Sequence, residues 1–256
     1  MRFASLGSGS KGNSTIIDDG ETCILIDLGF TLKETERRLR RLDVLPESID
    51  AILVTHEHAD HIHGVAPFAR KYKTPVYLTP ATYDQKKMGV LPDLQAVNCH
   101  KNFLIGSFEI EPVAVPHDAR EPCQYIVTSG LHRVGVLTDL GHISAHVRSR
   151  YAICHALLLE CNHDLGMLDQ GPYPYTLKKR VAGDHGHLNN HQAAELLNTV
   201  ELDQLQHLVI SHISEKNNSP DLAHIAVGPV LKDWGGKLHL AQQDLGFDWL
   251  EVSVPA

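Results

Sequence analysis

Short apolar runs recur along the chain, and six of them lead directly into a side chain that can bind a metal ion or move a proton. Runs of this length, bounded by turn residues, are typical of buried strands. Any one such polar residue would be an ordinary turn former, but strands that enter a common sheet bring their terminal loops to one edge. We therefore expect convergence of Asp27, His56, His117, Asp139, Glu160 and His212.

Helical spacing is clearest in two places. Thr31 and Glu34 form a capping-box pattern that predicts a helix start, and Asn189 or Asn190 is expected to cap a helix over 191–197. The first helix should bury its leucines and carry an outward basic face, which is either an ordinary solvated surface or a surface that tracks phosphates. That face consists of Lys33, Arg37, Arg38, Arg40 and Arg41.

The glycine-rich segment 7–12 spells GxGxxG, the pattern of a dinucleotide-binding loop. Such a loop must open a helix, whereas the residues that follow, 13–17 and 22–26, have the composition of strands, so we predict a glycine-rich hairpin. The segment is not a Walker A loop either, because Lys11 precedes the final glycine. It either lets two strands turn or forms an anion-binding nest with donors from Ser8, Ser10, Lys11, Asn13 and Ser14.

Four metal-capable side chains lie within six residues directly after the run 51–55: His56, His58, Asp60 and His61. Histidines two apart on an extended loop can share one metal ion, and the next two residues, where the chain turns toward a helix, can serve a second ion. The alternative is a solvated loop with chance histidines, because a motif match remains a hypothesis until its context is known.

Composition limits the class of protein without deciding its function. The chain has 256 residues, of which 43% are apolar, so it can bury a large core as one domain over 1–256 or as two tightly joined halves. We expect a cytoplasmic protein with no membrane contact, since no signal peptide or bilayer-length apolar run is present. The five cysteines are scattered and lack a CxxC pair, so buried free thiols are expected. The net charge of −8 argues against indiscriminate coating of nucleic acid.

The order of these residues resembles that of the metallo-β-lactamase superfamily: an acid, HxHxDH, a lone His, a lone Asp and a last His. The resemblance implies an α/β fold, the four-layer αββα sandwich, with two divalent ions at one edge of its sheets. It also implies that Asp27 braces the ligand loop. By position, one ion would be held by His56, His58 and His117, the other by Asp60, His61 and His212, with Asp139 bridging.

Two strings, 3–15 and 160–164, are similar to the YycJ (WalJ) branch of that superfamily, with Cys161 where many relatives have Ser. That branch is associated with 5′→3′ exonuclease activity on DNA, and its relatives include tRNA 3′-processing nucleases and PhnP-type phosphodiesterases. His187 is similar to the histidine of the tRNA-processing nucleases that lies near the scissile phosphate with a supporting glutamate, here Glu160. Alternatively His187 only braces its loop, and His163 either lies behind the ligands or contacts substrate.

Together these features predict a two-metal phosphodiester hydrolase that acts on nucleic acid, most of all DNA, without an organic cofactor. Zinc, manganese or iron suits the ligand set. Two ions would activate water and stabilise negative charge, Asp60 would orient that water or accept its proton, and His187 would protonate the leaving oxygen. Substrate contacts are expected from Ser10, Lys11, Asn13, His163, Arg38 and Arg41.

Other functions remain open at this point. A small-molecule cyclic or nucleotide phosphodiesterase would use the same centre, and so would a glyoxalase-II-like thioester hydrolase with a glutathione pocket. A noncatalytic binding module on the same fold would be expected to have lost ligands, and all seven are present here.

Overall fold

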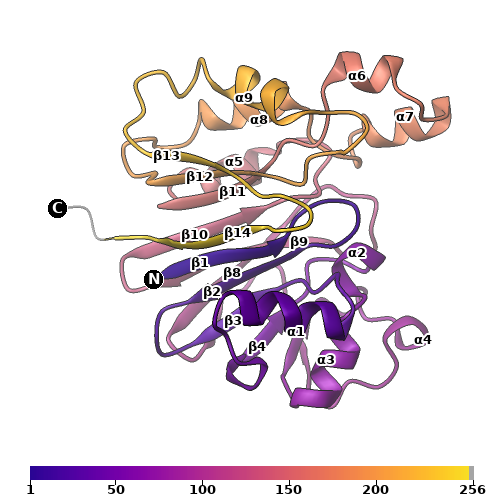
Figure 1. The fold of residues 1–256 in the computed structure, drawn as a ribbon, viewed down its shortest axis with the longest axis vertical. Coiled ribbons are helices and arrows are strands. Elements are labelled where there is room, and N and C mark those ends of the chain that lie inside the picture. Colours follow the sequence, from indigo (N-terminus) through magenta and orange to yellow (C-terminus); the bar gives the residue numbers. More distant parts are fainter. Residues whose placement is uncertain (254–256) are drawn as a thin grey trace.

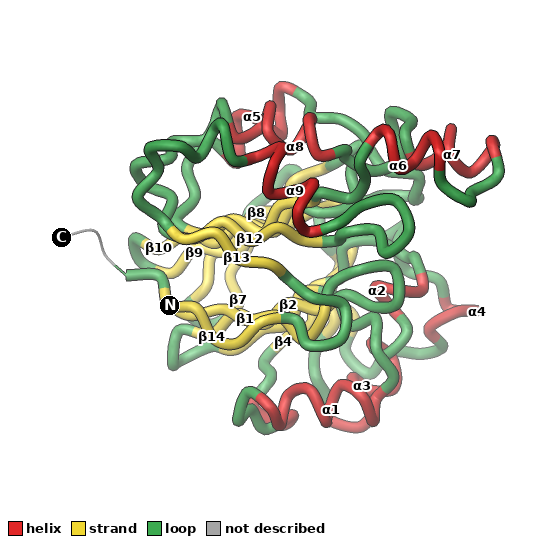
Figure 2. The backbone as a smooth tube through the Cα atoms, turned by 45° about the horizontal axis from the view of Figure 1, so that its top comes forward, coloured by secondary structure: helices red, strands yellow, loops and turns green. Residues whose placement is uncertain are grey.

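Two β-sheets stack face to face with helices on both outer sides in the computed structural model, which describes residues 1–253 (Figures 1 and 2). The first sheet contains β1 (Arg2–Gly7), β2 (Ser14–Asp18), β3 (Cys23–Ile26), β4 (Ala51–Leu53), β5 (Val76–Leu78), β6 (Leu94–Ala96) and β14 (Phe247–Glu251). The second contains β7 (Phe103–Ile105), β8 (Phe108–Ala114), β9 (Cys123–Ser129), β10 (His132–Leu137), β11 (Ala156–Glu160), β12 (His207–Ser211) and β13 (Lys237–Leu240). The predicted four-layer αββα sandwich is confirmed.

The two sheets have matching internal organisation. Their strand orders are β14-β1-β2-β3-β4-β5-β6 and β13-β12-β11-β10-β9-β8-β7. In each, an antiparallel half continues into a parallel half: β3 to β6 are parallel in the first sheet, and β10 to β13 in the second. Parallel neighbours end at the same edge, which is where ligand sites of open α/β sheets form.

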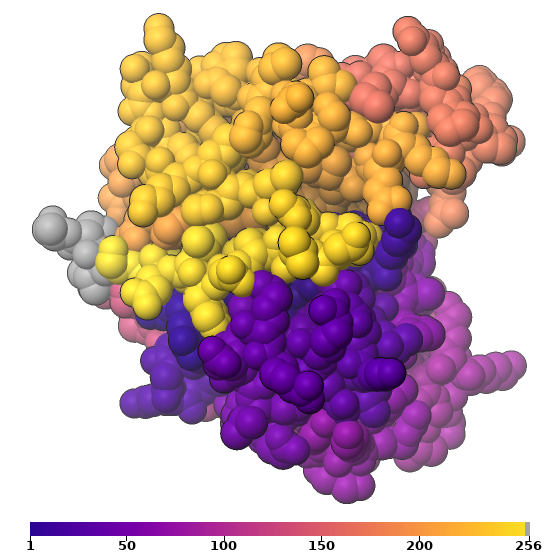
Figure 3. Space-filling view, in the orientation of Figure 1, coloured from indigo at the N-terminus to yellow at the C-terminus, as the bar shows by residue number. Residues whose placement is uncertain are grey.

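The helices are divided between the two outer faces. The first face carries α1 (Leu32–Arg41), the short α2 (Ala59–Ile62), α3 (Val65–Tyr72) and α4 (Gln85–Met88), with a 3₁₀ turn at Pro46–Ser48. The other side carries α5 (Ala145–Tyr151), α6 (Leu165–Gln170), α7 (Tyr175–Val181), α8 (Asn190–Leu197) and α9 (Pro220–Val227). In the space-filling view the yellow β14 lies against the indigo N-terminal half, since β14 returns to pair with β1 (Figure 3).

Three buried clusters hold the layers together. Phe3, Phe108 and Tyr125 belong to the cluster between the two sheets. A second cluster joins the first sheet to α1 and α3, and a third joins the second sheet to α5, α8 and α9. Burial of this apolar surface is the main stabilising force of the sandwich.

Several local expectations are met. Thr31 accepts a hydrogen bond from the Glu34 amide and begins α1, and α8 begins with a capping box made by Asn189 and Gln192. β1 and β2 pair antiparallel, which confirms the glycine-rich hairpin. Gly12 at its tip has φ +149°, and a Cβ there would lie 2.6 Å from the Phe30 ring. All five cysteines are free, and four are buried. Within residues 1–253 no helix is both long and apolar enough to cross a membrane.

The prediction that α1 carries an outward basic face is wrong for Arg38. Arg38 is buried. Its guanidinium donates hydrogen bonds to the carbonyls of Leu6 and Gln243 and to the Glu34 carboxylate. Its guanidinium carbon also lies 4.0 Å from the centre of the Phe30 ring. An arginine with this many fixed partners inside the structure braces the N-terminal loop instead of tracking phosphates.

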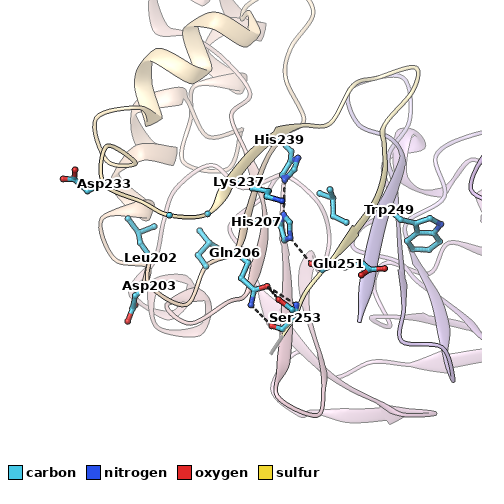
Figure 4. A pocket seen from close by; sticks show the side chains of 14 residues that line it. Leu202, Asp203, Gln206, His207, Asp233, Lys237, His239, Trp249, Glu251 and Ser253 are labelled. Carbon is cyan, nitrogen blue, oxygen red and sulfur yellow. Dashed lines mark hydrogen bonds between the residues drawn. The ribbon is translucent and has the colours of Figure 1, made fainter. Parts of the chain in front are cut away.

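A large open hollow of about 850 Å³ lies at the end of the sandwich opposite the predicted ligands, between β13 and β14 (Figure 4). His207 and His239 point toward each other there, with 3.0 Å between Nδ1 of His207 and Nε2 of His239. The other ring nitrogen of His207, Nε2, donates to the Glu251 carbonyl. Burial lowers the pKa of both imidazoles. This end of the sheets carries none of the six strand-end residues identified above.

Asp19 links the two sheets at the same remote end. It accepts hydrogen bonds from the hydroxyls of Ser107 (2.6 Å) and Ser129 (2.7 Å), in the other sheet, and from the amides of Glu21 and Thr22. Burial alone would raise the pKa of this carboxyl, but the serine and amide donors lower it to about 2.

We predict that Asp19→Ala lowers the free energy of unfolding by about 1–2 kcal/mol, because two hydroxyls and two amides, some of them partly buried, lose their acceptor. The carboxylate's contribution is complete above the ordinary pKa of about 3.9 and is lost as the pH falls through about 2. Urea denaturation should show that the difference in the free energy of unfolding between variant and wild type becomes smaller as the pH falls below 4. Glu21→Ala, in the same turn but exposed, is the control; equal losses from both variants would contradict the prediction.

Candidate metal centre

The strand ends carry the predicted residues to one edge. Asp27 directly follows β3, Asp139 lies two residues beyond β10, and His212 directly follows β12. Each of these three has a left-handed backbone, with φ of 59°, 55° and 52°. Such a conformation costs a non-glycine residue roughly 1–3 kcal/mol and persists where the surroundings enforce it. The sharp turns take the side chains out of the sheet alternation and toward the edge.

His56, His58 and His117 form the first group. Their ring nitrogens converge, with 3.0 Å from His56 Nε2 to His58 Nδ1 and 3.3 Å from His117 Nε2 to the same atom. The outer nitrogens of two rings are fixed: Thr55 Oγ1 lies 2.9 Å from His56 Nδ1, and His117 Nδ1 donates to the Gly186 carbonyl at 3.0 Å. Fixing the outer nitrogen orients an imidazole and selects the tautomer that can bind metal.

Asp60, His61 and His212 form the second group, with one atom from each lying within 4.8 Å of the others. Asp139 stands between the groups, because its Oδ2 lies 3.4 Å from His61 Nε2 and it also clusters with His56 and His61. The structure therefore brings together both predicted triads and the residue predicted to bridge them.

Asp27 holds the loop from behind, as expected. Its Oδ1 accepts the Thr55 amide at 2.8 Å, and its Oδ2 accepts the Thr55 hydroxyl at 2.8 Å and His61 Nδ1 at 2.7 Å. His61 thus donates from Nδ1, which leaves Nε2 facing Asp60 and Asp139 as the ring nitrogen available to a metal ion.

The two most buried carboxylates differ in a way that tests the fit of a cation. Both oxygens of Glu160 are satisfied: Oε1 accepts from His187 Nδ1 (2.8 Å) and His212 Nδ1 (3.0 Å), and Oε2 from two backbone amides. Asp139 Oδ2 is buried and has no hydrogen-bond partner among the described residues. An unpaired buried carboxylate oxygen is costly, and beside inward-facing imidazoles it fits a divalent cation.

Charge at this edge is shared between acids and imidazoles. Burial raises the pKa of Asp60, but His61 and His212 outweigh it and hold that pKa well below its ordinary value. Burial lowers the pKa of His212, yet Asp139, Asp60 and Glu160 raise it to about 10. His56, among other imidazoles, has its pKa lowered by burial. The acids thus create a strong preference for positive charge in the second group.

His187 and Glu160 meet as predicted, and the same carboxylate, against the effect of burial, raises the pKa of His187. Of the two alternatives for His163, the structure favours a place behind the ligands over a contact with substrate. His163 is fully buried, both ring nitrogens lack a partner in residues 1–253, and burial lowers its pKa to about 4. A side chain in this position lies behind the site and does not reach a substrate.

The expected substrate contacts fall into two sets. Ser10 and Lys11 are exposed beside the site, where Lys11 pairs with Glu215 at 2.7 Å. Asn13 is buried: its side chain accepts the Gly9 amide and reaches His61 Nε2 at 3.2 Å, so it shapes the loop. Arg41 is partly covered, donating to the Ser5 carbonyl and pairing with Asp248. Of the expected contacts, Ser10 and Lys11 are the exposed residues that lie beside the site.

Sequence reasoning missed part of the cavity in front of the ligands, which has a volume of about 180 Å³. Arg180 and Tyr173 line it, and Arg180 pairs through Nε with Asp118, whose other oxygen lies 3.5 Å from His117 Nε2. The available signal was the segment 171–180, in which two prolines and two tyrosines precede Lys-Lys-Arg between two site residues.

Comparison with known proteins agrees with this geometry. A model of the beta-lactamase superfamily domain matches residues 22–213, a span that includes every strand-end residue of the site. The chain belongs to the metallo-β-lactamase superfamily. It is thus a metal-dependent hydrolase, and the cluster is its divalent-metal site.

Relatives within the superfamily extend over nearly the whole chain. The chain is 35% identical over 241 residues to "Exodeoxyribonuclease YycJ" of Bacillus anthracis, covering 92% of this chain and 90% of the relative. It is 33% identical over 252 residues to "Exodeoxyribonuclease WalJ" of Streptococcus pneumoniae, covering 96% and 90%. The metallo-β-lactamase fold protein YhfI of Bacillus subtilis matches in structure with a TM-score of 0.74, at 17% identity, over 98% of this chain and 99% of that one. This last likeness supports the fold alone.

We predict that removing divalent metal destabilises this metallo-β-lactamase domain. A ligand present at a hundredfold its Kd stabilises by about 2.7 kcal/mol, which corresponds to a melting temperature roughly 5–10 °C lower after chelation and dialysis. Calorimetry with and without added Zn²⁺ or Mn²⁺ measures the shift. Asp139→Asn should shrink it, because the orphaned carboxylate is gone; an unchanged melting temperature in metal-free wild type would contradict the prediction.

Proposed function

We propose that the protein is a two-metal phosphodiester hydrolase that digests DNA from the 5′ end. The observation that carries the proposal is the similarity to two proteins named exodeoxyribonuclease, which reaches across at least nine tenths of both chains. The metal cluster alone cannot choose a substrate, because one fold and one centre can serve several chemistries. Similarity of this extent favours a nuclease over a thioester hydrolase or a noncatalytic module.

In this proposal one divalent ion is held by His56, His58 and His117, and the other by Asp60, His61 and His212, with Asp139 between them. When bound, two such ions lower the pKa of water and offset the charge that develops on phosphate. Zinc and manganese both suit mixed imidazole and carboxylate ligands, and iron is compatible.

The chain's own acids and bases then have separate tasks. Asp60 is partly exposed to the cavity, and its lowered pKa keeps it a carboxylate that can orient water or accept a proton. His187 donates from Nδ1 to Glu160, so Nε2 is the atom free to protonate a leaving oxygen. Glu160 raises the pKa of His187, which favours the protonated form that a general acid requires.

Three further expectations accompany the proposal. Residues 1–256 are expected to act as one domain, Ser10 and Lys11 to meet the terminal phosphate, and the location to be cytoplasmic. All three stay predictions.

The function is tested by digesting single- and double-stranded DNA and RNA, labelled at the 5′ or the 3′ end, with Mn²⁺- or Zn²⁺-loaded protein. We expect early release of the 5′ label as short products from DNA. Bis-p-nitrophenyl phosphate and lactoylglutathione serve as comparison substrates. Hydrolysis of the small diester without digestion of DNA would favour a small-molecule phosphodiesterase, and hydrolysis of the thioester alone would exclude the nuclease.

We predict that His187→Ala reduces turnover of DNA by about 10²–10⁴-fold, the usual contribution of a positioned acid or base. Elemental analysis should show that its metal content is unchanged. The loss should be smaller on bis-p-nitrophenyl phosphate, whose leaving group needs less protonation. His146→Ala, an exposed histidine on α5, is the control. Equal losses on both substrates would refute an acid role.

A further inference from the structure

Arg180 supplies a cation to a cavity whose charged lining otherwise consists of acids and imidazoles. Among the described residues that line this cavity, Arg180 is the one Lys or Arg, and it shares the lining with His58, Asp60, Asp118 and Asp139. Its side chain is 60% exposed. The metal groups include Asp60 and Asp139 but not Asp118, so a phosphodiester anion that enters the metal-loaded cavity still meets the Asp118 carboxylate, and the Arg180 cation beside it matters for binding.

The position of Arg180 is held firmly by the backbone around it. The His187 amide donates to the Val181 carbonyl at 2.9 Å, and a Cβ on Gly186 would lie 2.2 Å from the Arg180 carbonyl. The Asp118 amide donates to the His185 carbonyl at 2.9 Å. The end of α7 is therefore tied to the segment that carries His187.

Asp118 occupies only one edge of the Arg180 guanidinium. The pair uses Nε, and Nη1 and Nη2 of Arg180 form no hydrogen bond within residues 1–253. Guanidinium groups bind phosphate through two parallel N–H donors. Asp118 thus orients the group while leaving its outer edge available to a phosphate oxygen.

Aromatic and basic side chains accompany Arg180 on its own segment and on the loop that follows β12. Tyr173 lines the cavity, and Lys216 Nζ lies 5.9 Å from its ring centre. Tyr175 is 70% exposed, with Lys179 Nζ 5.1 Å from its ring centre. Figures 1 and 3 show that α6 and α7 project from the body of the molecule, at the upper right of the view. Exposed aromatics next to cations form the usual surface for unpaired bases and their phosphates.

We propose that Arg180 binds the substrate phosphate in the cavity and that Tyr173 stacks on the adjoining unpaired base, so the α6–α7 segment holds the end of the nucleic-acid chain that enters the site. The cavity of about 180 Å³ is smaller than the roughly 300–1,000 Å³ of clefts that enclose a drug-sized ligand, so the phosphate enters the cavity while the adjoining base lies against Tyr173 at its wall. This inference rests on the proposed nuclease function and locates its substrate surface on α7, away from the arginines of α1.

The test uses metal-loaded protein with a fluorescent single-stranded oligonucleotide whose phosphorothioate linkages slow cleavage, followed by anisotropy at several salt concentrations. Arg180→Ala should weaken binding about tenfold to a hundredfold and reduce the salt slope by about one. Arg180→Lys should keep the slope but recover only part of the affinity. Tyr173→Leu should weaken binding about tenfold with an unchanged slope, and Tyr173→Phe should behave like wild type.

Steady-state digestion of unmodified single strands adds a second readout, in which Arg180→Ala raises KM more than it lowers kcat. Arg148→Ala, a partly exposed arginine on α5 with no side-chain partner in the described chain, is the matched control. If wild type digests DNA and Arg180→Ala binds and digests equally well, the inference is wrong while the nuclease stands. If wild type digests no nucleic acid, the proposed function itself fails.

Discussion

The rest of the site depends on one electrostatic constraint: the negative charge of four carboxylates at one sheet edge has to be compensated. These carboxylates are buried or half-buried and have no Lys or Arg partner in the described residues. Asp27, Asp60, Asp139 and Glu160 form ion pairs only with histidines in residues 1–253. Removing charge from water costs several kcal/mol per ion unless it is compensated. Protonated imidazoles supply part of that compensation, since the acids raise the pKa of His212 and His187, but Asp139 Oδ2 still has no hydrogen-bond partner in residues 1–253, which suits the lining of a cation site.

The sheets meet this constraint through geometry that no single strand could supply. Parallel strands from both sheets end at one edge, and left-handed turns at Asp27, Asp139 and His212 direct the side chains inward. Glu160 then joins His187 and His212 through one oxygen and two backbone amides through the other. Backbone strain at the turns is offset by this hydrogen bonding, which explains why strain and function coincide here.

Much of this was predictable because strand ends are local features of sequence. The apolar runs and the HxHxDH loop were identified from residues that lie in β3, β4, β8, β10, β11 and β12 or follow them closely, whereas His187, between α7 and α8, was identified through the family resemblance. Partners distant in sequence were not. The burial of Arg38 depends on Phe30 and on a carbonyl 205 residues away, and the Arg180–Asp118 pair spans 62 residues. Periodicity shows which face of a helix is polar, but it does not show what packs against that face.

The segment that carries α6 and α7, which the sequence analysis did not identify, has residues of the site at both of its ends. α6 and α7 lie between β11, which ends in Glu160, and α8, which begins after His187. Because the His187 amide is bonded to the Val181 carbonyl, any displacement of α7 would move the imidazole proposed to protonate the leaving group. If the end of a DNA strand binds to α6 and α7, it would therefore also hold the His187 imidazole in place. Substrate recognition and proton transfer would then share one short stretch of backbone, and the metal ligands on the sheets would remain undisturbed.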